Sequence, residues 1–199
     1  MADPDTQRLR AFVFKNRGLL LALPAAALVA FGKPNALGIA LGLPIAFAGE
    51  LLRCWAVGYS GVTTRHDSVT APMLVSAGPY GYVRNPLYLG NFITAAGFAV
   101  AFTGGNGAAA RGALVFGSLA AMLAIYSVIV PHEEAFLRDR FGEAFDRYCE
   151  RVPRLFPQSE PVPDGQGTWN GAVVATAERH TFAVFGIMLA LLAVRALRS

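Results

Sequence analysis

The stretch GPYGYVRNPLYLG, residues 78–90, decides how this chain is built. It combines turn-forming glycines and prolines with three tyrosines and one arginine, and it continues without a break into a long apolar run. Pro86 disfavours helical backbone at Asn85 and gives the following helix a rigid first turn. Asparagine is also a favoured N-cap residue. The stretch therefore predicts a bent, fixed loop that ends at Asn85 and caps a helix over residues 87–103.

Apolar segments lie on both sides of this loop. The chain is 54% hydrophobic and 15% charged, whereas soluble domains carry about 25% charged residues. A membrane span needs about 20 mostly apolar residues. The predicted fold is all-α, a polytopic membrane helix bundle with about five transmembrane helices near residues 15–32, 36–58, 87–103, 112–131 and 172–195. Glu178, Arg179 and His180 shorten the last of these, which leaves an interfacial position as the alternative for it.

The basic residues indicate the topology. Two long segments lie between predicted spans, about 59–86 and 132–171. Thirteen Lys and Arg fall at the N-terminus, in these two segments and at the span ends beside them (Arg53 and Arg179), and four fall on the other side. The positive-inside rule then places the N-terminus and both long segments in the cytoplasm. Topology accounts for the net charge of +4, so we expect no nucleic-acid partner. The first residues mix acids with bases and do not read as a cleavable signal.

Residues 133–152 read as one amphipathic helix that Pro153 stops. Its apolar positions recur at steps of three or four. Glu134/Arg138 and Glu143/Arg147 have the spacing of helical ion pairs. Turn chemistry is expected at 32–35 and 103–107, and residues after Pro161 read as a linker to the last helix.

Two acidic sites stand out at the ends of predicted spans. Glu133 and Glu134 follow His132 where an apolar run reaches the interface, and adjacent helical residues point about 100° apart. We therefore expect one of the two carboxylates to point into the bundle, where an ionisable group is a functional candidate. The alternative is a solvated helix start. Glu50 and Arg53, three residues apart, favour a structural ion pair from which Arg53 snorkels to the interface.

The loop of residues 78–90 offers groups for a ligand. Its tyrosines could be ordinary interfacial anchors. The helix start after Asn85 offers free N–H groups and a positive partial charge, and Arg84 adds a cation. No cluster has zinc-type spacing, so no metal is expected, and Cys54 and Cys149 read as free thiols.

The blocks APMLVSAGPYGYVRNPLYLG and EEAFLRDRFGEAFDRYCERVPRLFP together resemble the integral-membrane methyltransferases, the family of isoprenylcysteine carboxyl methyltransferases and phospholipid N-methyltransferases. The resemblance covers about residues 65–157. It implies S-adenosyl-L-methionine as methyl donor, bound in a cytoplasmic pocket. We predict one membrane domain over 1–199, with a first hairpin (15–58), a cofactor-binding core (59–157) and a linker with a C-terminal helix (158–199).

The resemblance implies roles for individual residues. Many family members have His at position 85, whereas Asn cannot exchange a proton near neutral pH, so no acid–base role is assigned there. Glu134 and His132 are the candidate catalytic groups, since an amine acceptor would need a base. The cofactor-binding candidates are Met73, Leu74, Val75, Tyr80, Arg84, Asn85, Pro86, Leu87, Tyr88, Glu133 and Glu134.

The methyl acceptor stays open between a prenylcysteine-type carboxylate and a lipid amine. The prenylcysteine pattern implies an Arg just ahead of the acidic pair, and AIYSVIVPHEE has none. Arg151 and Arg154 are the candidate substrate contacts, as carboxylate or headgroup partners. A lipid-like small molecule and membrane lipids are the expected partners. A nicotinamide-dependent membrane reductase and a non-enzymatic membrane protein are the alternative functions.

Overall fold

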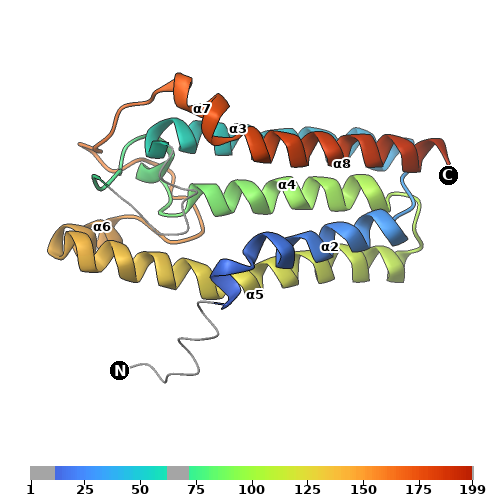
Figure 1. The fold of residues 1–199 in the computed structure, drawn as a ribbon, viewed down its shortest axis with the longest axis horizontal. Coiled ribbons are helices and arrows are strands. Elements are labelled where there is room, and N and C mark those ends of the chain that lie inside the picture. Colours follow the sequence, from blue (N-terminus) through green and yellow to red (C-terminus); the bar gives the residue numbers. More distant parts are fainter. Residues whose placement is uncertain (1–11, 62–71, 199) are drawn as a thin grey trace. The chain divides into compact units, whose positions relative to one another are not determined.

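The computed structural model describes residues 12–61 and 72–198, whose regular secondary structure consists of helices, with no strand among them. Figure 1 shows the helices, coloured in their order along the chain. They are α2 (Arg17–Phe31), α3 (Ala36–Ser60), the short 3₁₀ helix η2 (Gly78–Gly81), α4 (Pro86–Thr103), α5 (Ala108–Phe141), α6 (Glu143–Arg151), α7 (Gly171–Ala177) and α8 (Arg179–Leu197).

Four of the described helices, α3, α4, α5 and α8, are long and apolar enough to cross a membrane. The all-α polytopic prediction is thereby confirmed. The first expected span, 15–32, is shorter than predicted, since α2 has 15 residues. A crossing helix needs about 20. The last expected span, 172–195, is divided at Glu178 into α7 and α8.

The described residues form two compact units, and each long helix contributes to both. The first unit comprises residues 12–49, 92–129 and 183–198 of the described chain. Its core is aromatic: Phe185 packs edge-on against Phe47 and Phe98, with ring centroids 5.0 and 5.1 Å away. Beside it α3 and α4 touch through small residues, since a Cβ added to Gly97 would lie 2.7 Å from the Cα of Ala46. Small residues let membrane helices approach this closely.

The two predicted turns lie against each other at one end of this first unit. The backbone N–H of Lys33 donates to Asn106 Oδ1 at 2.7 Å, and that of Gly105 donates to the Lys33 carbonyl at 2.6 Å. The Asn35 amide donates to the Gly104 carbonyl at 2.9 Å. Turn chemistry thus fixes the hairpins α2–α3 and α4–α5 together.

The second unit comprises residues 50–61, 72–91 and 130–182. The predicted apolar set of the amphipathic segment does pack together, around the buried Phe145, Tyr148 and Val152. The prediction of one continuous helix over 133–152 is wrong. Gly142 has a φ of +53°, in the left-handed region that favours glycine, and it separates α5 from α6.

The predicted linker after Pro161 is part of a strap, which we define as residues 153–170. The backbone N–H of Val162 donates to the Gly81 carbonyl at 3.1 Å, and that of Ser76 donates to the Gln166 carbonyl at 2.9 Å. The Trp169 ring packs on Gly58, where an added Cβ would overlap the indole ring. The strap is therefore bonded along its length to the segment that precedes α4.

Candidate active site

Glu134 is the centre of a polar cluster that joins the loop before α4 to α5 and the start of the strap. Its Oε1 accepts hydrogen bonds from Arg84 Nε at 3.2 Å, Asn85 Nδ2 at 3.3 Å and Arg154 Nε at 3.2 Å. Its Oε2 accepts from Arg154 Nη2 at 2.5 Å. The side chain of Glu134 is buried, which confirms that one carboxylate of the acidic pair points inward. The predicted Glu134/Arg138 helical pair is replaced by these contacts.

Arg84 forms several hydrogen bonds besides the one to Glu134. Its Nη1 donates to the carbonyls of Cys149 and Val152 at 2.8 and 2.9 Å, so the guanidinium also closes the C-terminal end of α6. Its backbone N–H donates to the Pro153 carbonyl at 2.8 Å. The geometry makes Arg84 a framework residue, while its predicted contact with a cofactor carboxylate remains a prediction.

Glu133 is oriented by a different partner, Tyr88, in the first turns of α4. The Tyr88 hydroxyl donates to Glu133 Oε1 at 2.7 Å. Glu133 is half-buried, so its carboxylate is more accessible than that of Glu134. The two neighbouring carboxylates therefore have distinct environments: Glu134 faces two guanidinium groups and Glu133 faces a phenol.

The helix α4 begins at Pro86, directly after Asn85, where the sequence predicts it. The first backbone hydrogen bond of this helix runs from the Leu89 N–H to the Asn85 carbonyl at 3.1 Å. The side-chain amide of Asn85 donates to Glu134 and to the Arg154 carbonyl, both at 3.3 Å. The helix start and the acidic pair thus lie within hydrogen-bonding distance of each other.

The remaining candidates lie at varying distance from this cluster. Tyr80 accepts a hydrogen bond at its backbone carbonyl from the Tyr148 hydroxyl at 2.8 Å. Leu74 packs against the Phe145 cluster, and Val75 lies beside the strap at Gly167. Four of the candidates are exposed: Met73, His132, Arg151 and Arg154. The roles of all the candidates remain predictions.

Burial shifts the titration of the groups around the loop. It raises the pKa of Tyr80 to about 12, although a hydrogen bond with Ser60 lowers this pKa in part. Burial also raises the pKa of Tyr148, and so does the neighbouring Tyr80. Burial raises the pKa of the Cys149 thiol as well. All three groups are therefore neutral near pH 7.

A buried ion pair that the sequence did not predict lies in the same unit. Arg53 Nη2 donates to Glu178 Oε2 at 2.7 Å, and Nη1 donates to Asn91 Oδ1 at 2.5 Å and to the Leu87 carbonyl at 3.4 Å. Its Nε lies 3.9 Å from Glu50. Because Arg53 is buried, the snorkelling prediction is wrong. The signal for this pair was Glu178 itself, an acid within an apolar stretch.

No group of three or more His, Cys, Asp or Glu side chains in the described part of the chain is placed to hold a metal ion. Cys54 and Cys149 are free thiols, as predicted.

Comparison with known families matches residues 37–144 to the phospholipid methyltransferase family, more than half of the chain. The chain belongs to the phospholipid methyltransferase family. The matched region contains the candidates from Met73 to Glu134, whereas Arg151 and Arg154 follow it. With the four apolar helices, this membership makes the chain an integral membrane protein of a methyltransferase family.

Three relatives of this phospholipid methyltransferase family member are informative. It is 31% identical over 113 residues to the protein-S-isoprenylcysteine O-methyltransferase of Schizosaccharomyces pombe, covering 55% of this chain and 45% of that protein. It is 31% identical over 130 residues to a cobalt-zinc-cadmium resistance protein of Cupriavidus metallidurans, covering 65% and 51%. It is 36% identical over 85 residues to a nickel-cobalt-cadmium resistance protein of Alcaligenes xylosoxydans xylosoxydans, covering 43% and 36%.

The chain thus spans about half or less of the length of these relatives. No solved structure matches it.

Proposed function

We propose that this chain transfers the methyl group of S-adenosylmethionine to a lipid-like acceptor. The observation that carries the proposal is the convergence of two blocks about fifty residues apart, through Arg84 and Asn85 on Glu134 and through Tyr88 on Glu133. The relative named for isoprenylcysteine O-methyl transfer and the family name support the same reaction class.

The residues present fit this cofactor by charge. S-adenosylmethionine supplies an electrophilic methyl on a sulfonium, and it carries an ammonium and a carboxylate. Glu133 is half-buried and aligned by Tyr88, so it would hold the ammonium by a charge-assisted bond. The start of α4 at Pro86 would hold the carboxylate at its N–H groups.

Glu134 takes a positioning role in this proposal. Both of its oxygens already accept bonds from Arg84, Asn85 and Arg154. Its carboxylate fixes the loop before α4 against α5, so that Tyr88 and Glu133 keep their relative positions. A general base for an amine acceptor would then be His132, because Glu133 is engaged with the cofactor ammonium, and a carboxylate acceptor would need no base.

The acceptor is proposed to be a lipid or lipid-like molecule that enters from the bilayer, with the active site on the cytoplasmic side. Arg154 would contact its phosphate or carboxylate, because half of this side chain is exposed while it binds Glu134. Arg151 is exposed and would add a second positive charge.

Cofactor binding tests the proposal directly. We would titrate the detergent-purified chain with S-adenosylhomocysteine by calorimetry, and separately with NADPH. We expect binding of the first and a roughly 10- to 100-fold weaker affinity in Glu133→Gln, from the loss of a charged hydrogen bond worth about 1.5–3 kcal/mol. Glu150→Gln, an exposed acid of α6, is the matched control and should leave affinity unchanged. Binding of NADPH alone would support a reductase instead.

Methyl transfer tests the acceptor. Labelled S-adenosylmethionine would be supplied with a membrane-lipid extract in one reaction and with a farnesylcysteine analogue in another. Label in the lipid extract alone would favour a lipid amine, and label in the analogue alone would favour the carboxylate. The absence of label from both would contradict the proposed acceptor class. Cysteine-accessibility labelling at the exposed Arg151 position would test the cytoplasmic placement.

A further inference from the structure

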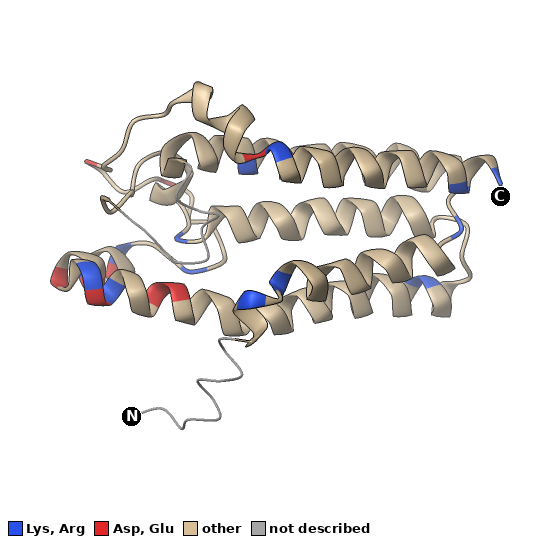
Figure 2. Cartoon of the chain, viewed as in Figure 1, with Lys and Arg blue, Asp and Glu red and all other residues tan. Residues whose placement is uncertain are grey.

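The described part of the first unit carries basic side chains and no acidic one. Its described residues, 12–49, 92–129 and 183–198, include six Lys and Arg and no Asp or Glu. Figure 2 shows this contrast, with both signs on α6 and only basic positions at the hairpin turns of the first unit. In the second unit the arginines at positions 53, 84, 138 and 154 pair with carboxylates. Within the described residues of the first unit, no side-chain carboxylate is available to balance its cations.

Basic side chains gather at the hairpin end of this unit, which we define by Lys33, Arg111, Arg195 and Arg198. Arg111 donates to the carbonyls of Thr103 at 3.1 Å and Asn106 at 3.3 Å, and also to that of Gly104. Asn106 in turn accepts from the Lys33 backbone. Carbonyl groups orient the Arg111 guanidinium but leave its charge uncompensated.

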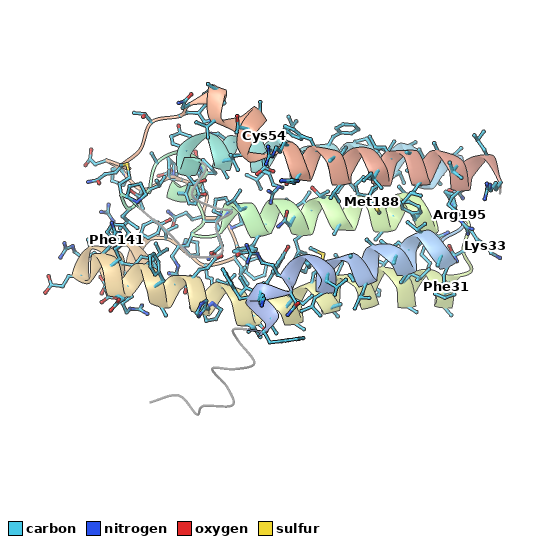
Figure 3. The ribbon with its side chains drawn as sticks, in the orientation of Figure 1. Phe31, Lys33, Cys54, Phe141, Met188 and Arg195 are labelled. Carbon is cyan, nitrogen blue, oxygen red and sulfur yellow. The ribbon has the colours of Figure 1, made fainter. Side chains whose placement is uncertain are left out.

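The C-terminal helix brings further cations to the same place. Arg195 Nη2 donates to the Gly32 carbonyl at 2.5 Å, next to Lys33. Arg198 follows one turn later and is exposed, as is Lys33. Figure 3 shows Lys33 and Arg195 at the same end of these helices, with Phe31 nearby. The cations thus come from the turn before α3, the start of α5 and the end of α8.

One end of each of the four candidate spans also lies at the hairpin end. The helix α3 begins at Ala36, α4 ends at Thr103, α5 begins at Ala108 and α8 ends at Leu197. Large apolar side chains are exposed beside the cations: Phe31 by 69%, Leu37 by 67% and Leu197 by 88%. Cations next to exposed apolar groups at the ends of membrane helices match a lipid phosphate above its acyl chains.

We propose that the hairpin end binds the headgroup of an anionic phospholipid. Lys33 and Arg111 contact its phosphate, Arg195 and Arg198 add attraction, and the exposed apolar side chains contact its chains. A lipid fits better than a free phosphate because of these apolar neighbours. A net-negative headgroup fits better than a zwitterionic one, because the unit offers no described carboxylate to an added ammonium. This binding is independent of methyl transfer.

Lipid-dependent thermal stabilisation tests the proposal. The purified chain in a neutral detergent would be titrated with dioleoyl phosphatidylglycerol, with dioleoyl phosphatidylcholine and with inorganic phosphate. We expect the unfolding temperature to rise with phosphatidylglycerol, to rise much less with the other two, and to lose most of the effect in 0.5 M salt, because salt screens exposed charges. An equal rise with phosphatidylcholine, or with phosphate alone, would overturn the proposal.

Variants locate the binding. Lys33→Gln/Arg198→Gln removes two exposed charges, and the hydrogen bonds of Lys33 in the turns come from its backbone. Each cation near a lipid surface is worth about 1 kcal/mol, or roughly fivefold in affinity, so the double variant should bind phosphatidylglycerol about 25-fold more weakly. Arg147→Gln/Arg179→Gln removes two exposed charges from the second unit and should keep the wild-type affinity. Equal affinities in both double variants would refute a site at the hairpin end.

Discussion

The buried pair of Arg53 and Glu178 gives the sharpest prediction about stability. The two side chains are 9% and 1% exposed, and they join residues that are 125 positions apart in the chain. Removing one partner of a buried pair typically costs about 3–5 kcal/mol, because the other charge stays buried. Side-chain hydrogen bonds between membrane helices are worth less, about 0.6 kcal/mol on average.

The groups around the pair determine how much stability each variant should lose. In Glu178→Gln the guanidinium keeps Asn91 and the Leu87 carbonyl as acceptors, and Glu50 still lies 3.9 Å away. We therefore expect a loss of about 2–3 kcal/mol, below the usual range for a broken pair. Arg53→Met leaves two carboxylates together without their cation, so it should cost about 4–5 kcal/mol. The double variant Arg53→Met/Glu178→Leu should recover part of that loss.

The assay is the free energy of unfolding in detergent, with S-adenosylhomocysteine affinity as a second measurement. Arg53 bonds the first turn of α4 at Leu87, so the variants that remain folded should also bind the ligand several-fold more weakly. Asp146→Asn is the control. It breaks the Arg138 pair, whose side chains are 54% and 51% exposed, and should cost less than about 1 kcal/mol. If Glu178→Gln cost no more than Asp146→Asn, the assignment of Arg53 and Glu178 as a stabilising buried pair would be refuted.

Three further predictions concern close packing, backbone conformation and pH. Gly97→Ala should destabilise the protein by about 1–3 kcal/mol in unfolding measurements, since its Cβ would meet the Ala46 backbone, whereas Gly117→Ala has open space and should not. Gly142→Ala should cost about 1–2 kcal/mol, because a φ of +53° strains a residue with a Cβ, and an unchanged melting temperature would contradict this. The Tyr80 pKa of about 12 lies above its ordinary value of 10, so the folded state holds this proton more tightly. The resulting stability is complete below about pH 10 and is lost as the pH rises through 12; Tyr80→Phe should show a shallower loss of melting temperature between those values.

The sequence predicted the helices well because their signals are local. The apolar runs give α3, α4, α5 and α8, and Asn85-Pro86 gives the start of α4 to within one residue. The same local reasoning missed the break at Gly142, because the apolar period continues across it while a single backbone conformation interrupts the helix. It also overestimated the first span, since the helix of this apolar run stops at Gly32 and has only 15 residues.

The sequence alone determined the family, through the resemblance of its two motif blocks, and it located the four long apolar helices, through composition and turn chemistry. It also nominated the candidate groups. Only the tertiary structure decided which groups meet. It assigned Glu134 to Arg84 and Arg154, Glu133 to Tyr88, and Arg53 to Glu178. It also showed that the strap is bonded to the loop before α4. Thirteen acids and seventeen bases allow many pairings, and burial together with the close approach of distant segments selects among them.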